Sequence, residues 1–428
     1  MLRLERAVSA RIHYAWVTLG LAFLTMLICV AVRASPAVLI VPLEHAFGWS
    51  PATISFAISL NLVLYGVLGP FGAALMQRIG IRRTVLCVLT TLLVGVSAST
   101  QMSAAWQLIL FWGLLIGAGT GMIGPAFGPT IVNRWFEERR GLALGIASAS
   151  SATGQLLFLP PLAAIAETDG WRSAVWIVVG ALAILLVIVA LLLRERPSDL
   201  GIGPLGLAEE PPTRASGANP ITAALGVLGT CLGSRDFWLL ALSFLVCGAS
   251  SSGLVGTHLI PFCFDNGIPE VKAAGLLAAM GVFNIAGTML SGWFSDRYDG
   301  RILLMVYYGL RGLSLLYLPF SDFNLYTLSI FAAFYGLDWF ATVPPMMRLV
   351  IAAFGKPATP IVYGWLFVGH QIGAASIAYL AGVLRADLGS YMTPFLLSGM
   401  LCLVAAAGVL WIGRRPSGFA AGPAESPA

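Results

Sequence analysis

Long apolar segments recur along the whole chain, separated by short polar connections. A helix rises about 1.5 Å per residue, so roughly 20 mostly apolar residues cross a bilayer, and these segments reach that length. They are too long and continuous for the strands of a membrane barrel. The pattern therefore predicts an all-α membrane protein with twelve transmembrane helices, at 14–42, 51–76, 84–101, 106–132, 141–165, 172–193, 236–264, 273–294, 302–320, 325–350, 359–385 and 392–413.

The two halves of this pattern repeat. An offset of 219 residues pairs Gln77 with Asp296. The same offset pairs further residues at matching points of matching spans, namely Arg78/Arg297, Gly117/Gly336, Pro125/Pro344, Gly145/Gly364, Gly154/Gly373 and Gly170/Gly389. Parallel repeats place a substrate site between the halves, near the middle of the bilayer. We expect two pseudo-symmetric halves of six helices, 1–193 and 236–428, and a cytoplasmic linker, 194–235, that is rich in Pro, Gly and charge.

Composition and charge fit a membrane protein and orient it. Hydrophobic residues make up 58% of the chain and charged residues 10%, whereas soluble proteins are roughly 25% charged. If the amino terminus is cytoplasmic, the outer loops keep only Arg172, Lys272 and Arg385 of the basic residues. Because Lys and Arg near helix ends resist translocation, a multi-pass protein of the plasma (inner) membrane with both termini cytoplasmic is predicted.

The remaining composition argues against several other classes of protein. The basic residues are spread over many loops, so no nucleic-acid partner is expected. The six cysteines are scattered without metal-ligand spacing, which predicts packing roles and no metal or cofactor. No nucleotide-binding or hydrolase motif is present, so we expect no enzyme, and transport must draw on a gradient.

Two short loops carry related motifs, GPFGAALMQRIGIRRT at 69–84 and GTMLSGWFSDRYDGR at 287–301. Both resemble the loop motif G-x-x-x-D-R-x-G-R-R of the major facilitator superfamily and imply its fold. The first copy keeps Arg78 and Gly80 but has Ala73, Gln77 and Ile81 where the motif has glycine, aspartate and a basic residue. The second copy keeps Gly292, Asp296 and Arg297. A charge-based latch is therefore expected at the second copy rather than the first.

Within the superfamily, the first half is similar to the branch of monocarboxylate transporters and oxalate/formate exchangers. The similarity lies in YAWV at 14–17, NRWFEERRGLALGIASASSATG at 133–154 and GWR at 170–172. It implies a carrier whose partners are a small organic anion, protons and the lipid bilayer, with a monomer sufficient for transport.

Arg33 is the first candidate for the substrate site, because ionisable groups inside lipid are costly and functional by default. It lies in the outer half of the first span, roughly 7 Å past its middle. Monocarboxylate transporters carry a basic residue in this helix, aligned with Ala34, so the resemblance implies a guanidinium that binds a carboxylate with two hydrogen bonds. The alternative is an arginine that reaches the outer headgroups.

His370 lies near the middle of the eleventh span. The oxalate exchangers place a lysine at the aligned position, so the resemblance implies a contact with the substrate anion. An imidazole also titrates near neutral pH and can accept a coupling proton. The alternative is a buried histidine that is hydrogen-bonded to a backbone carbonyl.

Asp338 in the tenth span and Arg311 in the ninth fall at similar depth. One interpretation is a carboxylate that gains and releases a proton during the transport cycle. The other is a structural ion pair between Asp338 and Arg311. The repeat pairs Asp338 with Gly119, so the fold does not demand a charge there.

The eighth span departs from the branch. Its members carry an arginine there that aligns with Thr288, and the acid near it aligns with Asn284. Anion binding must then rely on Arg33, His370 or Arg311. Neutral polar residues are predicted to complete the site or else to join helices, namely Asn61, Tyr65, Gln155 and Asn284.

These observations predict a secondary active transporter of a small, monocarboxylate-like organic anion, coupled to protons and working by alternating access. An anion-for-anion exchanger is the nearest alternative. An exporter of apolar or cationic compounds is another, in which Asp338 would replace Arg33 as the substrate contact. A membrane enzyme and a receptor without transport are alternatives from other classes.

Overall fold

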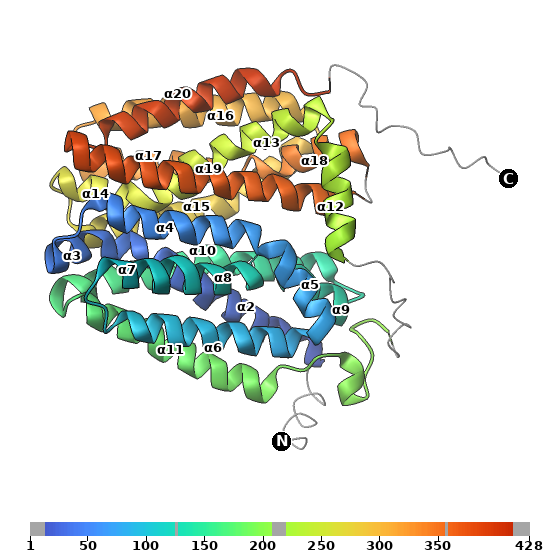
Figure 1. The fold of residues 1–428 in the computed structure, drawn as a ribbon. Helices are drawn as coiled ribbons and strands as arrows, with labels where there is room; N and C mark the ends of the chain where they lie inside the picture. Colours follow the sequence, from blue (N-terminus) through green and yellow to red (C-terminus); the bar gives the residue numbers. More distant parts are fainter. Residues whose placement is uncertain (1–12, 125–126, 208–219, 356–357, 414–428) are drawn as a thin grey trace.

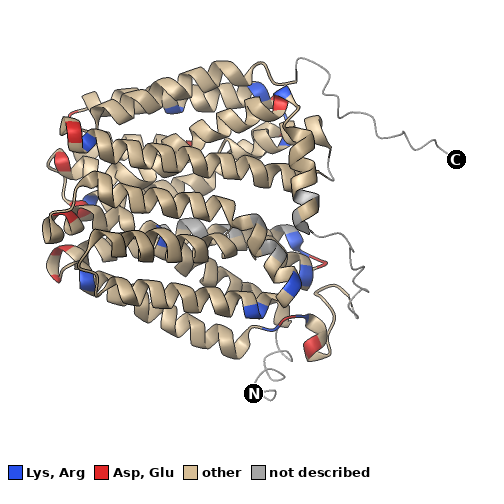
Figure 2. Ribbon diagram, viewed as in Figure 1, with Lys and Arg blue, Asp and Glu red and all other residues tan. Residues whose placement is uncertain are grey.

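The chain folds into a helical bundle with an apolar middle. The computed structural model describes residues 13–124, 127–207, 220–355 and 358–413. Within them, ten helical segments are long and apolar enough to cross a membrane, and two shorter apolar helices, Pro51–Val67 and Leu156–Thr168, complete the twelve predicted spans. Figure 2 shows most charged residues at the two ends of the bundle. The predicted all-α membrane fold is confirmed.

The helices of the first half are α2 (Tyr14–Ala34), α3 (Pro36–Phe47), α4 (Pro51–Val67), α5 (Gly69–Ile79), α6 (Ile81–Ser99), α7 (Ala105–Leu108), the π-helix η1 (Ile109–Ile116), α8 (Gly117–Ile123), α9 (Phe127–Trp135), α10 (Arg140–Thr168) and α11 (Trp171–Leu192). The second half contains α13 (Arg235–Gly248), the π-helix η3 (Ala249–Val255), α14 (Gly256–Asp265), α15 (Glu270–Ser295), α16 (Gly300–Tyr317), α17 (Leu325–Asp338), α18 (Val343–Phe354), α19 (Thr359–Leu388) and α20 (Met392–Val409). The two halves lie against each other (Figure 1). The predicted linker also forms a helix, α12 (Pro220–Cys231), which contacts α5 and α19.

Several spans predicted as single helices are broken. The first span breaks at Ser35, directly before Pro36, and the tenth breaks between Asp338 and Val343. Proline has no N–H to donate to the preceding turn, and it disfavours a helical backbone conformation in the residue before it. Helices therefore often end there. The carbonyls released at such a break need other partners, and in the tenth span buried side chains supply them.

The sequence repeat recurs as a packing contact. A Cβ atom added to Gly117 on α8 would lie 2.7 Å from the Cα atom of Asn61 on α4. A Cβ atom added to Gly336 on α17 would lie 2.8 Å from the Cα atom of Met280 on α15. Both members of the second contact lie 219 residues after those of the first. Each half therefore uses a glycine at the same place to bring two helices into close contact.

Replacing Gly117 by alanine should lower the thermal stability of the protein. The added methyl group must push α4 and α8 apart, and such overpacking costs about 1–3 kcal/mol. The matched control is Gly180→Ala on α11, where an added Cβ atom meets nothing within 4 Å. Thermal unfolding in detergent, followed by size-exclusion chromatography, should show a lower midpoint for Gly117→Ala alone. Equal midpoints would contradict a tight contact at Gly117.

Candidate functional site

A cavity of about 240 Å³ lies between the two halves of the bundle. The first half lines it with residues of α2, α3, α4, η1 and α8, and the second half with residues of η3, α14, the break after α17, and α19. Of these lining residues, all within the described part of the chain, Arg33 alone carries a permanent charge. The predicted position of the site, between the halves, thus coincides with a cavity of positive character.

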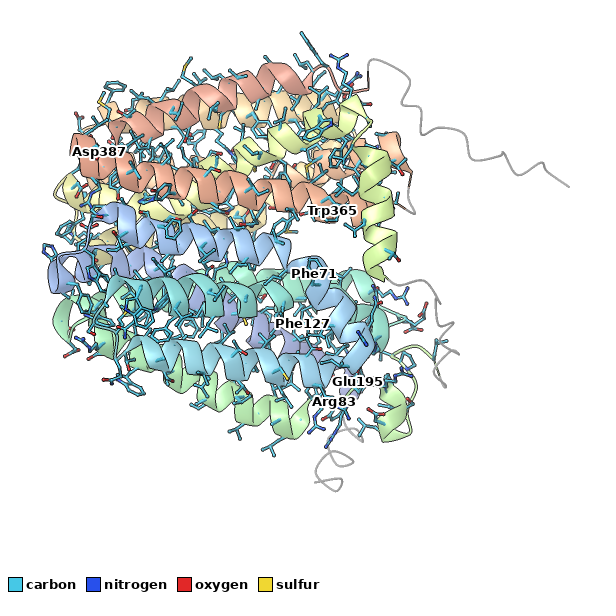
Figure 3. The ribbon with its side chains drawn as sticks, in the orientation of Figure 1. Phe71, Arg83, Phe127, Glu195, Trp365 and Asp387 are labelled. Carbon is cyan, nitrogen blue, oxygen red and sulfur yellow. The ribbon has the colours of Figure 1, made fainter. Side chains whose placement is uncertain are left out.

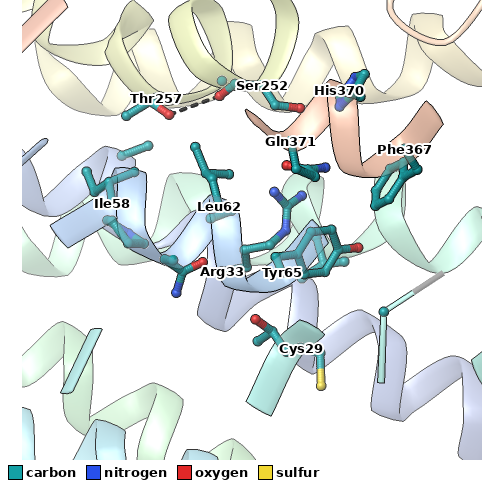
Figure 4. A pocket seen from close by; sticks show the side chains of 18 of the residues that line it. Cys29, Arg33, Ile58, Leu62, Tyr65, Ser252, Thr257, Phe367, His370 and Gln371 are labelled. Carbon is teal, nitrogen blue, oxygen red and sulfur yellow. Dashed lines mark hydrogen bonds between the residues drawn. The ribbon is translucent and has the colours of Figure 1, made fainter. Parts of the chain in front are cut away.

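Four side chains of this cavity have buried polar atoms without a partner among the described residues. The atoms are Nε of Arg33, Nε1 of Trp112, both ring nitrogens of His370 and Oε1 of Gln371. Figure 4 shows the guanidinium of Arg33 directed from the first half towards Gln371. A buried polar group left unpartnered costs about 1–3 kcal/mol, so a group of this kind calls for a further partner. The arrangement can accept a ligand that offers oxygen atoms to Arg33.

Arg33 turns towards the cavity and not towards lipid headgroups. Its guanidinium carbon lies 4.9 Å from the centre of the Tyr65 ring, in a cation–π contact. Among the ion pairs within the described residues, none includes Arg33. Its charge is therefore available to an anion.

Two further predicted residues, Tyr65 and Asn61, line the cavity, and a third, Gln155, cannot be assigned to it. Tyr65 is half-buried there, and buried Asn61 donates its amide N–H to the carbonyl of Trp112 at 2.8 Å. That carbonyl belongs to the π-helix η1, where the regular helical pattern is interrupted. Gln155 lies on α10, but its side chain falls outside the described part of the structure.

Asp338 and Arg311 contact each other, and neither is among the residues that line the cavity. Nε of Arg311 donates to Oδ2 of Asp338 at 2.6 Å, and Nη2 donates to the carbonyls of Asp338 at 2.6 Å and Trp339 at 3.2 Å. These carbonyls lie at the break between α17 and α18. Arg311 thus neutralises the carboxylate and also caps the end of α17.

Asn284 contributes to the same break. Its side-chain oxygen accepts the N–H of Phe340 at 3.1 Å and the hydroxyl of Thr288 at 3.1 Å. Asn284 is not among the residues that line the cavity, whereas Trp339 and Phe340 are. Arg311 and Asn284 therefore hold the turn that presents two aromatic side chains to the cavity.

The sequence analysis overlooked several lining residues. On α19, Tyr363, Phe367 and Gln371 follow one another at intervals of four and line the cavity beside His370. Residues at this spacing share one face of a helix. The position of His370, extended by helical periodicity, could have identified them. Trp112 gave no such signal, because nothing in its neighbourhood marks the π-helix.

The first copy of the loop motif lies at the end of the bundle where α2 begins and α20 ends, which we call the terminal end. Gln77 and Arg78 are exposed there.

Gly80 has a φ of +96° and lies so close to Glu195 that an added Cβ atom would be 2.7 Å from its Oε2. Glu195 accepts the N–H groups of Ile81 and Arg82, each at 2.9 Å, and pairs with Arg134. Figure 3 labels Glu195 and Arg83, both at this end of the bundle. A charged latch thus exists in the first half, with its acid on the segment after α11.

The second copy carries its acid in the motif itself. Oδ1 of Asp296 lies 3.6 Å from Nη1 of Arg348 on α18, and the guanidinium of Arg297 lies 3.8 Å from the centre of a ring of Trp293. Gly292 has open space around it. In the same loop, a hydrogen bond from Arg301 lowers the pKa of the Asp299 carboxyl. The loop therefore reaches the neighbouring helix, as its motif predicts.

Comparisons with known proteins match nearly the whole chain to one family. The sequence model of the Major Facilitator Superfamily matches residues 21–374 and 273–427. Monocarboxylate transporter 13 of Rattus norvegicus is 27% identical over 93% of this chain and 88% of its own length. Monocarboxylate transporter 11 of Homo sapiens is 27% identical over 91% of this chain and 81% of its own length.

A solved structure shares the fold. The crystal structure of a bacterial homologue of the human lysosomal transporter Spinster, in an inward-facing and unoccupied conformation, superimposes with a TM-score of 0.72 at 15% identity. The alignment covers 94% of this chain and 97% of that one. The expectation drawn from the loop motifs is confirmed, and so is the similarity to monocarboxylate transporters. The chain belongs to the Major Facilitator Superfamily, a family of membrane transporters and not of enzymes.

Proposed function

We propose that this protein is a secondary active transporter that carries a small organic anion, of the monocarboxylate class, together with a proton. The observation that carries the proposal is the cavity between the halves, in which Arg33 is the one permanent charge among the lining residues and has no ion-pair partner among the described residues. A cationic substrate would need a carboxylate there, but Asp338 is bound to Arg311 and does not line the cavity. The names of the relatives, monocarboxylate transporters 11 and 13, support the same class of substrate.

The substrate carboxylate would be held from both halves. The guanidinium of Arg33 presents parallel N–H groups that match the two oxygens of a carboxylate. His370 and Gln371 approach the same space from α19. A ligand that contacts both halves shifts their relative positions when it binds one conformation of the transporter more tightly than the other. We take residues 1–193 and 236–428 as the moving halves and 194–235 as their linker.

His370 is the proton carrier in this proposal. Both ring nitrogens are buried in the cavity without a partner among the described residues. A carboxylate bound beside the imidazole stabilises its protonated form, so anion and proton favour each other's binding. Asp338, whose Oδ2 is fixed by Arg311, has a structural role here.

The halves are joined by an ion-pair cluster at the end opposite the terminal end, which we call the far end. Nη1 of Arg385 on α19 contacts Oε2 of Glu44 on α3 at 2.7 Å, across the two halves. Nε and Nη2 of the same arginine each contact Asp265, within the second half, at 2.9 Å. At the level of the cavity, Ser59 on α4 donates its hydroxyl to the carbonyl of Ala375 on α19 at 2.8 Å, a second contact between the halves. The far end is therefore closed, and alternating access requires the pair Glu44–Arg385 to open.

Replacing Glu44 by glutamine should favour opening of the far end. The pair is mostly buried and crosses the halves, so its loss removes about 1 kcal/mol from the closed arrangement, roughly a fivefold shift. A cysteine placed at Ser59 should then react faster with a membrane-impermeant maleimide, with labelling assigned to residue 59 by mass spectrometry.

The matched control for this experiment is Asp265→Asn, which removes the acid that pairs with Arg385 inside one half. It should raise the labelling rate of residue 59 less than Glu44→Gln does. Equal effects of the two substitutions, or no effect of either, would contradict a gate at Glu44.

We place the protein in the plasma (inner) membrane with both termini in the cytoplasm. The terminal end carries the loop arginines, including Arg78, Arg82 and Arg134, and the positive-inside rule puts such an end in the cytoplasm. The monomer contains residues from both halves in one cavity, so we expect it to suffice for transport.

Uptake into proteoliposomes tests the proposal. Radiolabelled lactate, pyruvate, oxalate, formate and phenylpyruvate are supplied under an inward proton gradient, with protein-free liposomes as the blank. Symport predicts electroneutral uptake of a monovalent anion, driven by the gradient without internal substrate. Uptake that requires an internal carboxylate would indicate an exchanger instead. No uptake of any compound by folded protein would contradict the proposal for these carboxylates.

A further inference from the structure

Aromatic side chains from both halves lie on one side of the polar centre formed by Arg33, His370 and Gln371. Tyr363 and Phe367 precede His370 on α19, and Tyr65 follows Asn61 on α4. Because α19 runs from the terminal end, Tyr363 and Phe367 lie on the terminal side of the polar centre, and the ring of Tyr65 joins them through its contact with Phe367. All three line the cavity and are half-buried.

The rings form a connected wall. The ring centres of Tyr65 and Phe367 lie 5.9 Å apart at an interplanar angle of 67°, so an aromatic pair joins the two halves. Tyr363 and Phe367 lie 6.5 Å apart at 34°. The ring of Phe367 is nearly parallel to that of His370, with their centres 5.6 Å apart. The wall therefore begins directly beside the group that meets the carboxylate in the proposed function.

A second aromatic surface comes from the break in the tenth span. Trp339 and Phe340 line the same cavity. Their backbone is fixed by Arg311, which donates to the carbonyl of Trp339 at 3.2 Å, and by Asn284, which accepts the N–H of Phe340 at 3.1 Å. The backbone that carries these two side chains is thus held in place before a ligand arrives.

A very small acid would use little of this surface. The cavity measures about 240 Å³, whereas roughly 10–15 Å³ of such cavity volume is enough for one water molecule. Lactate or pyruvate could satisfy Arg33 and leave the aromatic wall in contact with water. Apolar surface in a cavity favours a ligand that removes it from water.

We infer that the substrate is a monocarboxylate with an aromatic ring near its carboxyl group, an inference that rests on the proposed function. The carboxylate meets Arg33 and His370, and the ring packs against the wall that Tyr65 and Phe367 form together. Aromatic rings prefer tilted or offset contacts with centres 4.5–7 Å apart, which this wall already shows between its own members. Tyr65 thus has two contacts, one with the cation that binds the carboxylate and one with the ring.

Binding of three acids that share a propanoate group tests the inference. Isothermal titration calorimetry of the full-length protein in lipid nanodiscs, at neutral pH, compares propanoate, 3-cyclohexylpropanoate and 3-phenylpropanoate. The phenyl compound should bind at least tenfold more tightly than propanoate, because it buries an additional ring. It should also bind about three- to tenfold more tightly than the cyclohexyl compound, because contacts between aromatic rings add to apolar burial.

Two leucine substitutions locate the effect. Phe367→Leu should remove the preference for phenyl over cyclohexyl. The matched control is Phe334→Leu, whose ring is 64% exposed on the outside of the bundle. That control should leave all three affinities unchanged.

The outcomes separate this inference from the proposed function. Equal affinities for phenyl and cyclohexyl compounds, or for phenyl compound and propanoate, would overturn the aromatic preference and leave the anion site intact. Absence of binding of all three acids to unaltered, monodisperse protein would contradict both. Tight binding of the phenyl compound that is unchanged in Arg33→Gln would overturn the anion site.

Discussion

Replacing Arg33 by glutamine should abolish measurable carboxylate uptake into proteoliposomes. The guanidinium is the one permanent charge among the described residues that line the cavity. A hydrogen bond to a charged group contributes about 1.5–3 kcal/mol, and a carboxylate held by two such bonds loses both. We expect the affinity for the anion to fall at least 100-fold, measured by calorimetry alongside the uptake rate.

Two further variants separate the role of this guanidinium from that of positive charge in general. Arg33→Lys keeps the positive charge but loses the parallel N–H groups of the guanidinium, so it should still bind the carboxylate weakly. Arg172→Gln removes a positive charge that stacks on Trp171, outside the cavity, and should transport normally. If Arg33→Gln retains uptake with an unchanged affinity, the substrate does not bind at Arg33.

The pattern of apolar residues was sufficient to predict the fold, because lipid leaves few structures open to the chain. Backbone groups must be satisfied within each span, so a long apolar segment is a helix. The breaks were not predicted, although Pro36 and Pro344 mark two of them. A proline can kink a membrane helix or end it, and the outcome depends on whether neighbours such as Arg311 and Asn284 satisfy the released groups.

Depth in the membrane identified candidates for the site but not the direction in which they point. Arg33, Asn61, Tyr65 and His370 line one cavity. Asp338 lies at a comparable position in its span but pairs with Arg311. The sequence carries no signal for the rotation of one helix about its axis relative to its neighbours, and that rotation decides between a cavity and a packed interface. The predicted roles of all these residues remain predictions.

The first latch illustrates a similar limit. The motif lacks its usual acid because position 77 is glutamine, so no charged latch was expected there. Glu195 supplies the acid from a distant part of the chain and caps the amino end of α6. The positive φ of Gly80 accompanies this close approach of Glu195. The spacing of residues within a motif cannot show that its missing acid is supplied by a residue more than 100 positions further along the chain.

Replacing Arg311 by glutamine should destabilise the protein more than any other substitution considered above. Arg311 is fully buried and Asp338 is 11% exposed, so the change leaves a buried carboxylate without its cation. It also frees the carbonyls of Asp338 and Trp339 at the break. Removing one partner of a buried pair costs about 3–5 kcal/mol. The midpoint of thermal unfolding in detergent should fall by many degrees.

The double variant Arg311→Gln/Asp338→Asn decides whether this pair is structural or carries the proton. Without either charge, no carboxylate remains unpaired, so the double variant should be more stable than Arg311→Gln alone. If the pair is structural, the double variant should keep gradient-driven uptake with an unchanged pH profile, whereas His370→Gln should lose the dependence on the gradient. If instead the double variant loses proton coupling while it stays folded, Asp338 is the proton carrier and the role proposed for His370 is wrong.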